Sequence, residues 1–338
     1  MPSLSSKVVT ALPALCFAGG LLAALPASAQ TYTIKDLGVL GTTRFSIPHC
    51  VNQNGLVVGE SNYQGGGAGK AFLYQNNAMV DLSPAGSLKS IAYSINTTGV
   101  IAGMVEDASG NTHPALWRNG VASLLNYSGV SYAVNYAGAM VGQVQDASSV
   151  NHAFLWTPTV PNGGTGSLQY LNNGGSANGI NHFTQVVGSI PSGTGSHAFL
   201  WDASHGSKDL GALGTSNQMF GTGINYNGIV IGSFVGTGSV FHAAVWTPTT
   251  NNGTTGAWSD LGIGQALSIN SSGQIVGKTD TAAILWQNGV AKNLNTLIPA
   301  GSGWTLFEAD SISDTGQITG AGSINGSMSH AFLLTPVH

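Results

Sequence analysis

The amino-acid sequence predicts an all-β protein, a seven-bladed β-propeller of four-stranded blades. The chain of 338 residues contains 49 glycines, and only 7% of its residues are charged, which is typical of many short strands joined by tight turns. One sequence unit of about 44 residues recurs seven times, and this length is that of one propeller blade. The repeat is also out of phase with the chain ends, so the first strand of the protein can complete the last blade and close the ring.

The first 29 residues are expected to be a signal peptide. Lys7 supplies a positive charge, an apolar stretch follows from Val8 to Leu25, and Ala27-Ser28-Ala29 offers the small residues that precede a cleavage site. A membrane anchor is the alternative, and the small-residue cleavage site argues against it. We therefore expect cleavage between Ala29 and Gln30, a single domain over residues 30–338, and a location in the periplasm or outside the cell.

The first conserved frame within the repeat is Asn-x-x-Gly, followed four residues later by a second glycine. Its first residue, the frame asparagine, lies at Asn52, Asn96, Asn135, Asn181, Asn225, Asn270 and, as a serine, Ser313. Asn and Gly tolerate positive φ, so the frame predicts a tight turn. The apolar run after each turn, such as Leu56-Val57-Val58, predicts a strand that is buried on both faces.

Two further frames complete the unit. The second reads HAFLW at His152–Trp156 and His197–Trp201, with variants at Lys70–Tyr74, His113–Trp117, His242–Trp246, Ala282–Trp286 and His330–Leu334. The third reads Asp-Leu-Gly or a variant and follows each HAFLW segment. The strand before the turn, the strand after it, the HAFLW strand and the Asp-Leu-Gly strand make four strands in each unit.

The chain begins with the fourth strand of a unit and ends with the third. The last copy stops after Phe332–Pro336 without an Asp-Leu-Gly strand, whereas Lys35–Gly41 supplies one near the mature N-terminus and closely matches Lys208–Gly214. In a closed ring the N-terminal strand completes the last blade. An open solenoid would instead need distinct polar caps, so the sequence favours the propeller.

These repeats resemble the HAF-type repeats of exported bacterial proteins. The resemblance rests on HAFLW, on IN-x-x-G-x-VVG and on Asp-Leu-Gly, and it covers nearly all of the mature chain. It implies an exported protein and brings no catalytic residues. The departures are local, with Lys70 and Ala282 in place of the histidine and Tyr74 and Leu334 in place of the tryptophan.

Composition and spacing argue against several classes of partner. The net charge of −4 and the lack of a basic stripe argue against nucleic acid. After cleavage of the leader no apolar run is long enough for a transmembrane segment, and we expect a monomer without a cofactor.

The repeated histidines lie in different blades and cannot converge on one metal ion, so we predict a packing role with one hydrogen bond for each.

Cys50 is the one cysteine left after cleavage, so no internal disulfide is expected. It could be a nucleophile. Its equivalents in the other copies are all small, namely Ser94, Ala133, Gly179, Gly223, Ser268 and Ser311. We therefore expect it to belong to a ring of small residues packed near the axis.

The position three residues before the frame asparagine varies between copies and carries the functional hypothesis. It is occupied by His49, Tyr93, Tyr132, Asn178, Thr222, Leu267 and Asp310. We expect it to line the mouth of the central channel on the face opposite the turns, where loops bearing Trp304, Asp107 and Asp146 also gather. Variable polar and aromatic groups on a rigid scaffold are where binding usually occurs. The predicted ligand-binding residues are His49, Tyr93, Tyr132, Trp304 and Asp310.

Two classes of function remain open. The first is a secreted, non-catalytic binding or structural scaffold that presents this face to a glycan, a peptide or a cell-envelope or extracellular protein. The alternative is a polysaccharide-acting hydrolase or lyase in which His49, Asp310, Glu308 and Tyr132 supply acid and base groups. A pair of carboxylates within about 5–10 Å in the channel would favour the enzyme.

Overall fold

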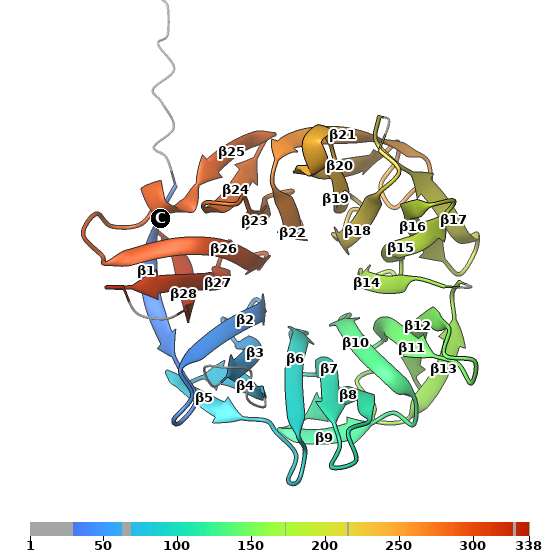
Figure 1. The fold of residues 1–338 in the computed structure, drawn as a ribbon, viewed down its shortest axis with the longest axis horizontal. Helices are drawn as coiled ribbons and strands as arrows, with labels where there is room; N and C mark the ends of the chain where they lie inside the picture. Colours follow the sequence, from blue (N-terminus) through green and yellow to red (C-terminus); the bar gives the residue numbers. More distant parts are fainter. Residues whose placement is uncertain (1–29, 63–68, 173, 215, 327–328, 338) are drawn as a thin grey trace, which may run out of the picture.

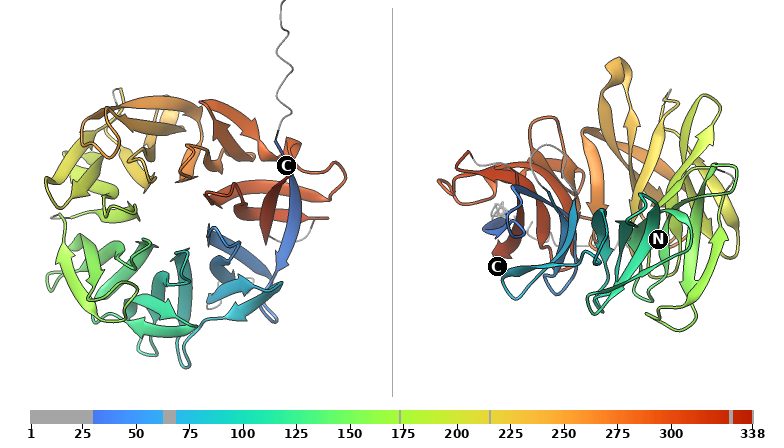
Figure 2. Two further views of the ribbon diagram at one scale, coloured as in Figure 1. Left: turned by 180° about the vertical axis from the view of Figure 1, so that it is seen from behind. Right: turned by 60° about the horizontal axis from the view of Figure 1, so that its bottom comes forward.

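The computed structural model describes residues 30–62, 69–172, 174–214, 216–326 and 329–337, and the expected signal peptide lies outside them. Within these residues, seven four-stranded antiparallel sheets stand as blades around a central axis (Figure 1, Figure 2). The predicted seven-bladed propeller is therefore confirmed. In this described part of the chain, no helix combines the length and hydrophobicity of a membrane span.

Blades 1 to 4 follow one another in chain order, each with its first strand nearest the axis (Figure 1). Blade 1 comprises β2 (Phe45–Val51), β3 (Val57–Asn62), β4 (Lys70–Gln75) and β5 (Ala78–Asp81). Blade 2 comprises β6 (Lys89–Ile95), β7 (Ile101–Glu106), β8 (Thr112–Arg118) and β9 (Val121–Leu124). Blade 3 comprises β10 (Ser128–Val134), β11 (Met140–Gln145), β12 (Asn151–Pro158) and β13 (Gly166–Tyr170). Blade 4 comprises β14 (Ser176–Ile180), β15 (Val186–Ser192), β16 (Gly195–Asp202) and β17 (Gly206–Gly211).

The remaining three blades include the one that joins the two ends of the chain. Blade 5 comprises β18 (Met219–Ile224), β19 (Val230–Val235), β20 (Phe241–Pro248) and β21 (Gly256–Ile263), with the 3₁₀ turn η1 (Thr237–Ser239) before β20. Blade 6 comprises β22 (Gln265–Ile269), β23 (Ile275–Lys278), β24 (Ala283–Gln287) and β25 (Val290–Asn293), followed by η2 (Leu294–Thr296). Blade 7 comprises β26 (Trp304–Ile312), β27 (Ile318–Ile324), β28 (His330–Val337) and β1 (Thr31–Gly38).

The hydrophobic core lies between the blades and follows the period-2 pattern of HAFLW. In β12, Phe154 and Trp156 pack with residues of blade 2, whereas Ala153 and Leu155 pack with residues of blade 4. Each third strand therefore contributes one face to each of two interfaces. This explains why the whole pentapeptide, and not alternate positions alone, recurs in the sequence.

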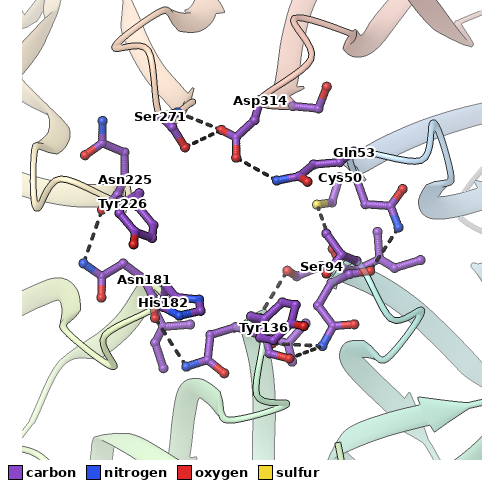
Figure 3. Close-up of a pocket in the computed structure, with 18 of the residues that line it drawn as sticks. Cys50, Gln53, Ser94, Tyr136, Asn181, His182, Asn225, Tyr226, Ser271 and Asp314 are labelled. Atoms are coloured by element: carbon purple, nitrogen blue, oxygen red, sulfur yellow. Dashed lines mark hydrogen bonds between the residues drawn. The ribbon is translucent and has the colours of Figure 1, made fainter.

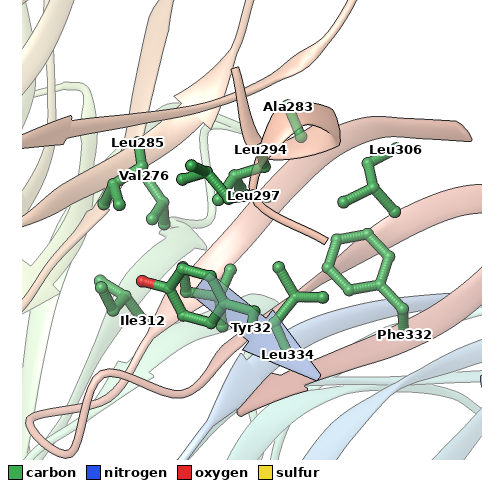
Figure 4. Close-up of a cluster of buried hydrophobic side chains, with 12 residues drawn as sticks. Tyr32, Val276, Ala283, Leu285, Leu294, Leu297, Leu306, Ile312, Phe332 and Leu334 are labelled. Carbon is green, nitrogen blue, oxygen red and sulfur yellow. The ribbon is translucent and has the colours of Figure 1, made fainter. Parts of the chain in front are cut away.

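The N-terminal strand closes the ring as predicted. β1 pairs with β28 from Thr31 opposite Val337 to Gly38 opposite Ala331, and Figure 1 shows the blue strand beside the red one. Tyr32 is buried in the core between blades 6 and 7 (Figure 4), and its backbone N–H donates to the Leu297 carbonyl at 2.9 Å. β1 is thus held by its own blade and by the preceding one.

The histidine of HAFLW binds an aspartate of its own blade in five blades. In blades 4, 5 and 7 the acceptor is the Asp-Leu-Gly aspartate, in the pairs His197–Asp209 at 2.9 Å, His242–Asp260 at 3.0 Å and His330–Asp36 at 3.1 Å. In blades 2 and 3 it comes from the loop before the third strand, in the pairs His113–Asp107 at 3.1 Å and His152–Asp146 at 2.9 Å. The hydrogen bond expected of these histidines is therefore present. Asp107 and Asp146, placed by sequence among candidate functional loops, are bound within the scaffold.

The two partners of this pair change together from blade to blade. In blade 1, Lys70 replaces the histidine and still reaches Asp81, with Nζ 2.9 Å from Oδ2. In blade 6, where Ala282 has no polar side chain, the aspartate is replaced by Asn293. The histidine or lysine and its aspartate partner are therefore present or absent together, as expected for one intra-blade contact.

The frame asparagine makes hydrogen bonds both within its turn and between blades. Asn225 Oδ1 accepts from the backbone N–H groups of Asn227 and Ile229 at 3.0 Å each. Its Nδ2 donates to the carbonyl of Asn270 in the next blade at 3.0 Å. The same inter-blade bond joins Asn52 to Asn96, Asn96 to Asn135, Asn135 to Asn181, Asn181 to Asn225 and Asn270 to Ser313.

The ring of asparagines is interrupted between blades 7 and 1. Ser313 Oγ accepts from the Gln317 N–H at 3.1 Å, which serves its own turn, but a serine has no amide to reach the next blade. The neighbouring residue makes the connection instead, because Asp314 Oδ2 accepts from Gln53 Nε2 at 2.7 Å. Asp314 Oδ1 also accepts from the backbone N–H and the hydroxyl of Ser271 in blade 6.

Replacing Asn225 by alanine should destabilise the protein by about 2–3 kcal/mol, because it removes the inter-blade bond and leaves buried turn N–H groups without an acceptor. Conversely, Ser313→Asn should add about 1 kcal/mol by supplying the seventh inter-blade bond. Urea denaturation with an unchanged m-value measures both effects.

Ser204→Asn is the matched control, since this exposed serine lies in the turn between β16 and β17, away from the frame asparagines. Its effect should stay within about 0.5 kcal/mol. A lower denaturation midpoint for Ser313→Asn than for the unmodified protein would contradict the two-fold role assigned to the frame asparagine.

Candidate functional site

The first strand of every blade contains a β-bulge at the same position. The strand registers skip one residue between Pro48 and Cys50 and at the six equivalent places. The skipped residues are His49, Tyr93, Tyr132, Asn178, Thr222, Leu267 and Asp310. A bulged residue has no ladder partner and its side chain is redirected, which frees this position from the packing pattern of the strand.

The second glycine of the sequence frame accommodates this bulge. Gly142 pairs with Ser131, immediately before the bulged Tyr132. A Cβ atom at Gly142 would lie 2.0 Å from the Val130 carbonyl oxygen and 2.9 Å from the Phe154 ring. Only glycine fits this close approach of two backbones, which explains why the residue recurs in all seven copies.

All seven bulged residues line one cavity of about 210 Å³ at the axis. It opens on the face opposite the Asn-x-x-Gly turns, which we call the loop face. The sequence placed these residues at the channel mouth, and the structure brings together four of the five predicted ligand-binding residues there. They come from consecutive blades in the order Asp310, His49, Tyr93 and Tyr132.

Three of these side chains form a continuous aromatic arc. The ring centroids of His49 and Tyr93 are 5.0 Å apart, and those of Tyr93 and Tyr132 are 5.6 Å apart in an edge-to-face arrangement. Such geometries are favourable for aromatic pairs. On the other side of the mouth, Asn178 and Thr222 are bound to backbone carbonyls of the following blades.

The fifth predicted residue, Trp304, lies elsewhere. It begins β26, six residues before Asp310, which corresponds to about 20 Å along an extended strand. Its ring packs edge-on against Phe332 at a centroid distance of 6.0 Å and adjoins the core between blades 6 and 7. The sequence pattern did not reveal how long β26 is. Because of this length, Trp304 lies at the end of the strand that is far from the axis.

Burial shifts the pKa values of titratable groups at the loop-face mouth in the direction that favours their uncharged forms. It lowers the pKa of His49 to about 4, although a Glu60 carboxylate oxygen lies 4.0 Å from Nε2. Burial, followed by the charges of Glu60 and Tyr132, raises the pKa of Tyr93 to about 12. Burial and then the charge of Glu308 raise the pKa of Asp310 well above its usual range, against the opposing effect of Lys278.

Several polar atoms at this mouth have no hydrogen-bond partner among the described residues. They are His49 Nε2, Glu60 Oε2 and Asp310 Oδ2, and each is shielded from solvent. Folded proteins leave few buried polar atoms unsatisfied, and such groups often belong to functional sites. The mouth therefore offers donors and acceptors that the scaffold itself does not use.

The carboxylate pair required by the enzyme hypothesis is not found in this cavity. Glu308 is not among its lining residues, and its Oε2 is 2.7 Å from Lys278 Nζ in the neighbouring blade. Asp310 is the one carboxylate among the described lining residues.

Cys50 belongs to the ring of small residues as expected. Its Sγ faces the Ile95 carbonyl at 3.9 Å, and burial raises the pKa of the thiol, which disfavours a nucleophilic thiolate. Equivalent serines bind the next blade, since Ser94 Oγ accepts from the Val134 N–H at 3.3 Å and Ser311 Oγ from the Val51 N–H at 3.2 Å.

A second cavity, of about 320 Å³, opens on the opposite or turn face and was not predicted (Figure 3). The residue that follows each frame position lies there, and all seven line this cavity, namely Gln53, Thr97, Tyr136, His182, Tyr226, Ser271 and Asp314. Three consecutive blades place aromatic side chains at this position. The sequence carried this signal as Asn-Tyr, Asn-His-Phe and Asn-Tyr at the starts of three successive turns.

Comparison with known proteins assigns no family to the chain. No protein-family model matches it, and no curated protein matches it. The crystal structure of TolB from Acinetobacter baumannii is similar, with 11% sequence identity and a TM-score of 0.47, over 89% of this chain and 66% of that one. The chain thus spans 66% of the length of that protein, and a likeness of this extent carries no conclusion about function.

Stability should increase with pH between about 4 and 6.5 through His49. In the unfolded chain this histidine titrates near 6.5, whereas in the folded protein its pKa is about 4. The unfolded state therefore binds more protons within this window, so the free energy of unfolding rises with pH and falls on acidification. A shift of this size corresponds to at most about 3 kcal/mol.

Urea denaturation of the protein and of His49→Gln at several pH values measures this contribution. Glu60, Asp310, Glu308 and Lys278 are present in both proteins, so their titration cancels to first order in the difference. The variant should gain stability relative to the unmodified protein as the pH falls from 6.5 to 4. Parallel pH profiles would show that His49 is not held neutral by the fold.

Proposed function

We propose that the protein is an exported, non-catalytic binding protein that takes a peptide segment of a cell-envelope or extracellular partner into the loop-face mouth of its channel. Export rests on the expected signal peptide and on the resemblance to HAF-type repeats. The binding role rests on one observation, the ring of seven bulged residues. The scaffold repeats sevenfold, whereas the residues of this ring differ in chemistry from blade to blade.

The chemistry of the mouth supports an uncharged, hydrogen-bonding ligand. Burial lowers the pKa of His49 to about 4 and raises the pKa of Asp310, so both shifts favour the uncharged form, and the shielded Nε2 and Oδ2 atoms have no hydrogen-bond partner among the described residues. A peptide backbone supplies both N–H and C=O groups to such atoms. Tyr93 and Tyr132 add apolar ring surface beside them, as is common in protein interfaces.

The size of the mouth limits how the ligand enters. Its cavity of about 210 Å³ is smaller than the roughly 300–1,000 Å³ typical of sites that enclose a small molecule. We therefore propose that only the tip of a loop or a chain end is inserted, while the surrounding blade loops contact the rest of the partner.

The arrangement of carboxylates favours binding over polysaccharide hydrolysis. General acid–base cleavage of a glycosidic bond uses two carboxyl groups that flank the bond. Here Asp310 lines the mouth, whereas Glu308 is bound to Lys278 outside it.

Selection of peptides from a displayed library of random 12-residue loops against the purified protein tests the proposal. Selected peptides should bind the unmodified protein, and Tyr132→Ala and Asp310→Leu should each weaken binding by about tenfold or more. Tyr226→Ala, which alters an exposed tyrosine on the opposite, turn face, should have no effect on peptide binding. Failure to select any peptide, or equal affinity for all three variants, would sink the proposal.

A further inference from the structure

We propose that the turn face carries a separate carbohydrate-binding site, in which a neutral hexopyranose stacks on an aromatic platform. The platform is formed by Tyr136, His182, Phe183 and Tyr226, from the turns of blades 3, 4 and 5. It lies at the opposite end of the channel from the loop-face mouth, and it stands independently of the function proposed above.

The four rings form one continuous surface. His182 lies between the two tyrosines, with centroids 5.4 Å from Tyr136 and 5.6 Å from Tyr226. Phe183 extends the surface at 5.0 Å from Tyr226. The side chains of Tyr136, Phe183 and Tyr226 are 57%, 50% and 49% exposed. Large aromatic residues that gather while remaining half exposed mark interaction sites on soluble proteins.

The backbone beneath the platform is held by two equivalent hairpins, β12–β13 and β20–β21. Asn162 at the tip of the first donates its N–H to the Ala137 carbonyl at 2.8 Å and its Nδ2 to the Tyr136 carbonyl at 3.2 Å. Asn252 at the tip of the second donates its N–H to the Asn227 carbonyl at 2.9 Å.

The second hairpin also fixes the turn between them. Gln185 of blade 4 donates from Nε2 to the Asn252 carbonyl at 2.9 Å, and Asn181 donates from Nδ2 to Asn252 Oδ1 at 3.2 Å. All three turns that carry the aromatic rings are therefore tied to a hairpin. A surface that is already ordered loses little conformational entropy when a ligand binds.

Apolar side chains such as Ile95, Ile269 and Ile312 also line the cavity, but the residues that follow the frame position in the other four blades are polar, which gives the site two unlike halves at this position. Around the ring from blade 6 to blade 2, the residues are Ser271, Asp314, Gln53 and Thr97, whereas the aromatic residues occupy blades 3 to 5. Asp314 accepts three hydrogen bonds, two from Ser271 and one from Gln53. Its two oxygens offer about four acceptor positions, so about one remains for a ligand hydroxyl.

A hexopyranose matches this division. One face of the sugar ring presents C–H groups that pack against the electron-rich faces of aromatic rings, and its hydroxyls lie around the edge. The cavity of about 320 Å³ lies within the range of small-molecule sites, so it can take one or two sugar residues.

The contacts between the rings argue against a quaternary ammonium ligand, the main alternative for clustered aromatic residues. An aromatic cage holds a cation between separated ring faces. Here neighbouring rings touch one another at centroid distances of 5.0–5.6 Å, which leaves no gap for an ammonium group between them. The ring planes are tilted by 41–58° to one another, so a sugar ring that stacks on the outer face of one aromatic ring and contacts the edge of the next fits this geometry better.

Calorimetric titration of the purified protein with cellohexaose, laminarihexaose, mannohexaose and N-acetylchitohexaose tests the inference, with tetramethylammonium chloride as the competing probe. At least one saccharide should bind, and Tyr136→Ala and Tyr226→Ala should each raise its Kd by about tenfold or more. Tyr226→Phe retains the ring and should stay within about twofold of the unmodified protein. Tyr127→Ala is the control for loss of an exposed tyrosine elsewhere.

Three results would overturn the inference. One is the absence of binding for all four saccharides at millimolar concentration. Another is saccharide binding that survives in both alanine variants. The third is tetramethylammonium binding that is lost in Tyr226→Ala while no saccharide binds. None of these results bears on peptide binding at the loop face, so the two proposals fail or stand separately.

Discussion

The frame asparagine is the residue on which the ring depends, because one side-chain amide serves both local and long-range structure. Its oxygen satisfies two backbone N–H groups of the tight turn, and its nitrogen reaches the same residue of the next blade, as Asn225 does with Asn270. An amide is the smallest side chain that has an acceptor and a donor at a fixed separation. Formation of the turn therefore positions the donor for the next blade, and the geometry of one repeat determines how its neighbour is placed.

Two positions near the frame asparagine, one before it and one after it, have side chains that take no part in its own hydrogen bonds. Three residues before it, the bulge removes the side chain from the strand ladder, and the opposing glycine provides the space, as Gly142 does beside Tyr132. One residue after it, the side chain points from the turn toward the axis (Figure 3). Where the side chain at these positions does not itself bind a neighbouring blade, as those of Asn178, Thr222 and Asp314 do, its substitution leaves the scaffold bonds intact. The channel can therefore be lined with different chemistry at its two ends without loss of the fold.

The repeat, the closed ring and most of the loop-face mouth could be predicted from the sequence, because each follows from spacing. The signal for the bulge was also present in the second glycine of the frame, because a glycine that recurs inside a buried strand indicates a close approach of backbones. Trp304 was misplaced because the sequence does not show how far β26 extends from the axis. The sequence analysis did not predict the aromatic platform, whose residues follow the turn asparagine. The support that Asn162 and Asn252 give to these turns depends on hairpins that fold back on the ring. Such contacts between distant segments leave no periodic pattern.

The replacement of the seventh frame asparagine by Ser313 helps to explain why the two halves of the turn-face cavity differ. Ser313 cannot bridge blades 7 and 1, so the connection passes to Asp314 and Gln53. Both residues directly follow their frame residue, which is the position that carries aromatic rings in blades 3 to 5. A carboxylate and an amide are thereby held at the cavity opposite Tyr136 and Tyr226. The same two residues therefore connect blades 7 and 1 and place polar groups at this site. With an asparagine in place of Ser313, neither Asp314 nor Gln53 would be needed for the connection.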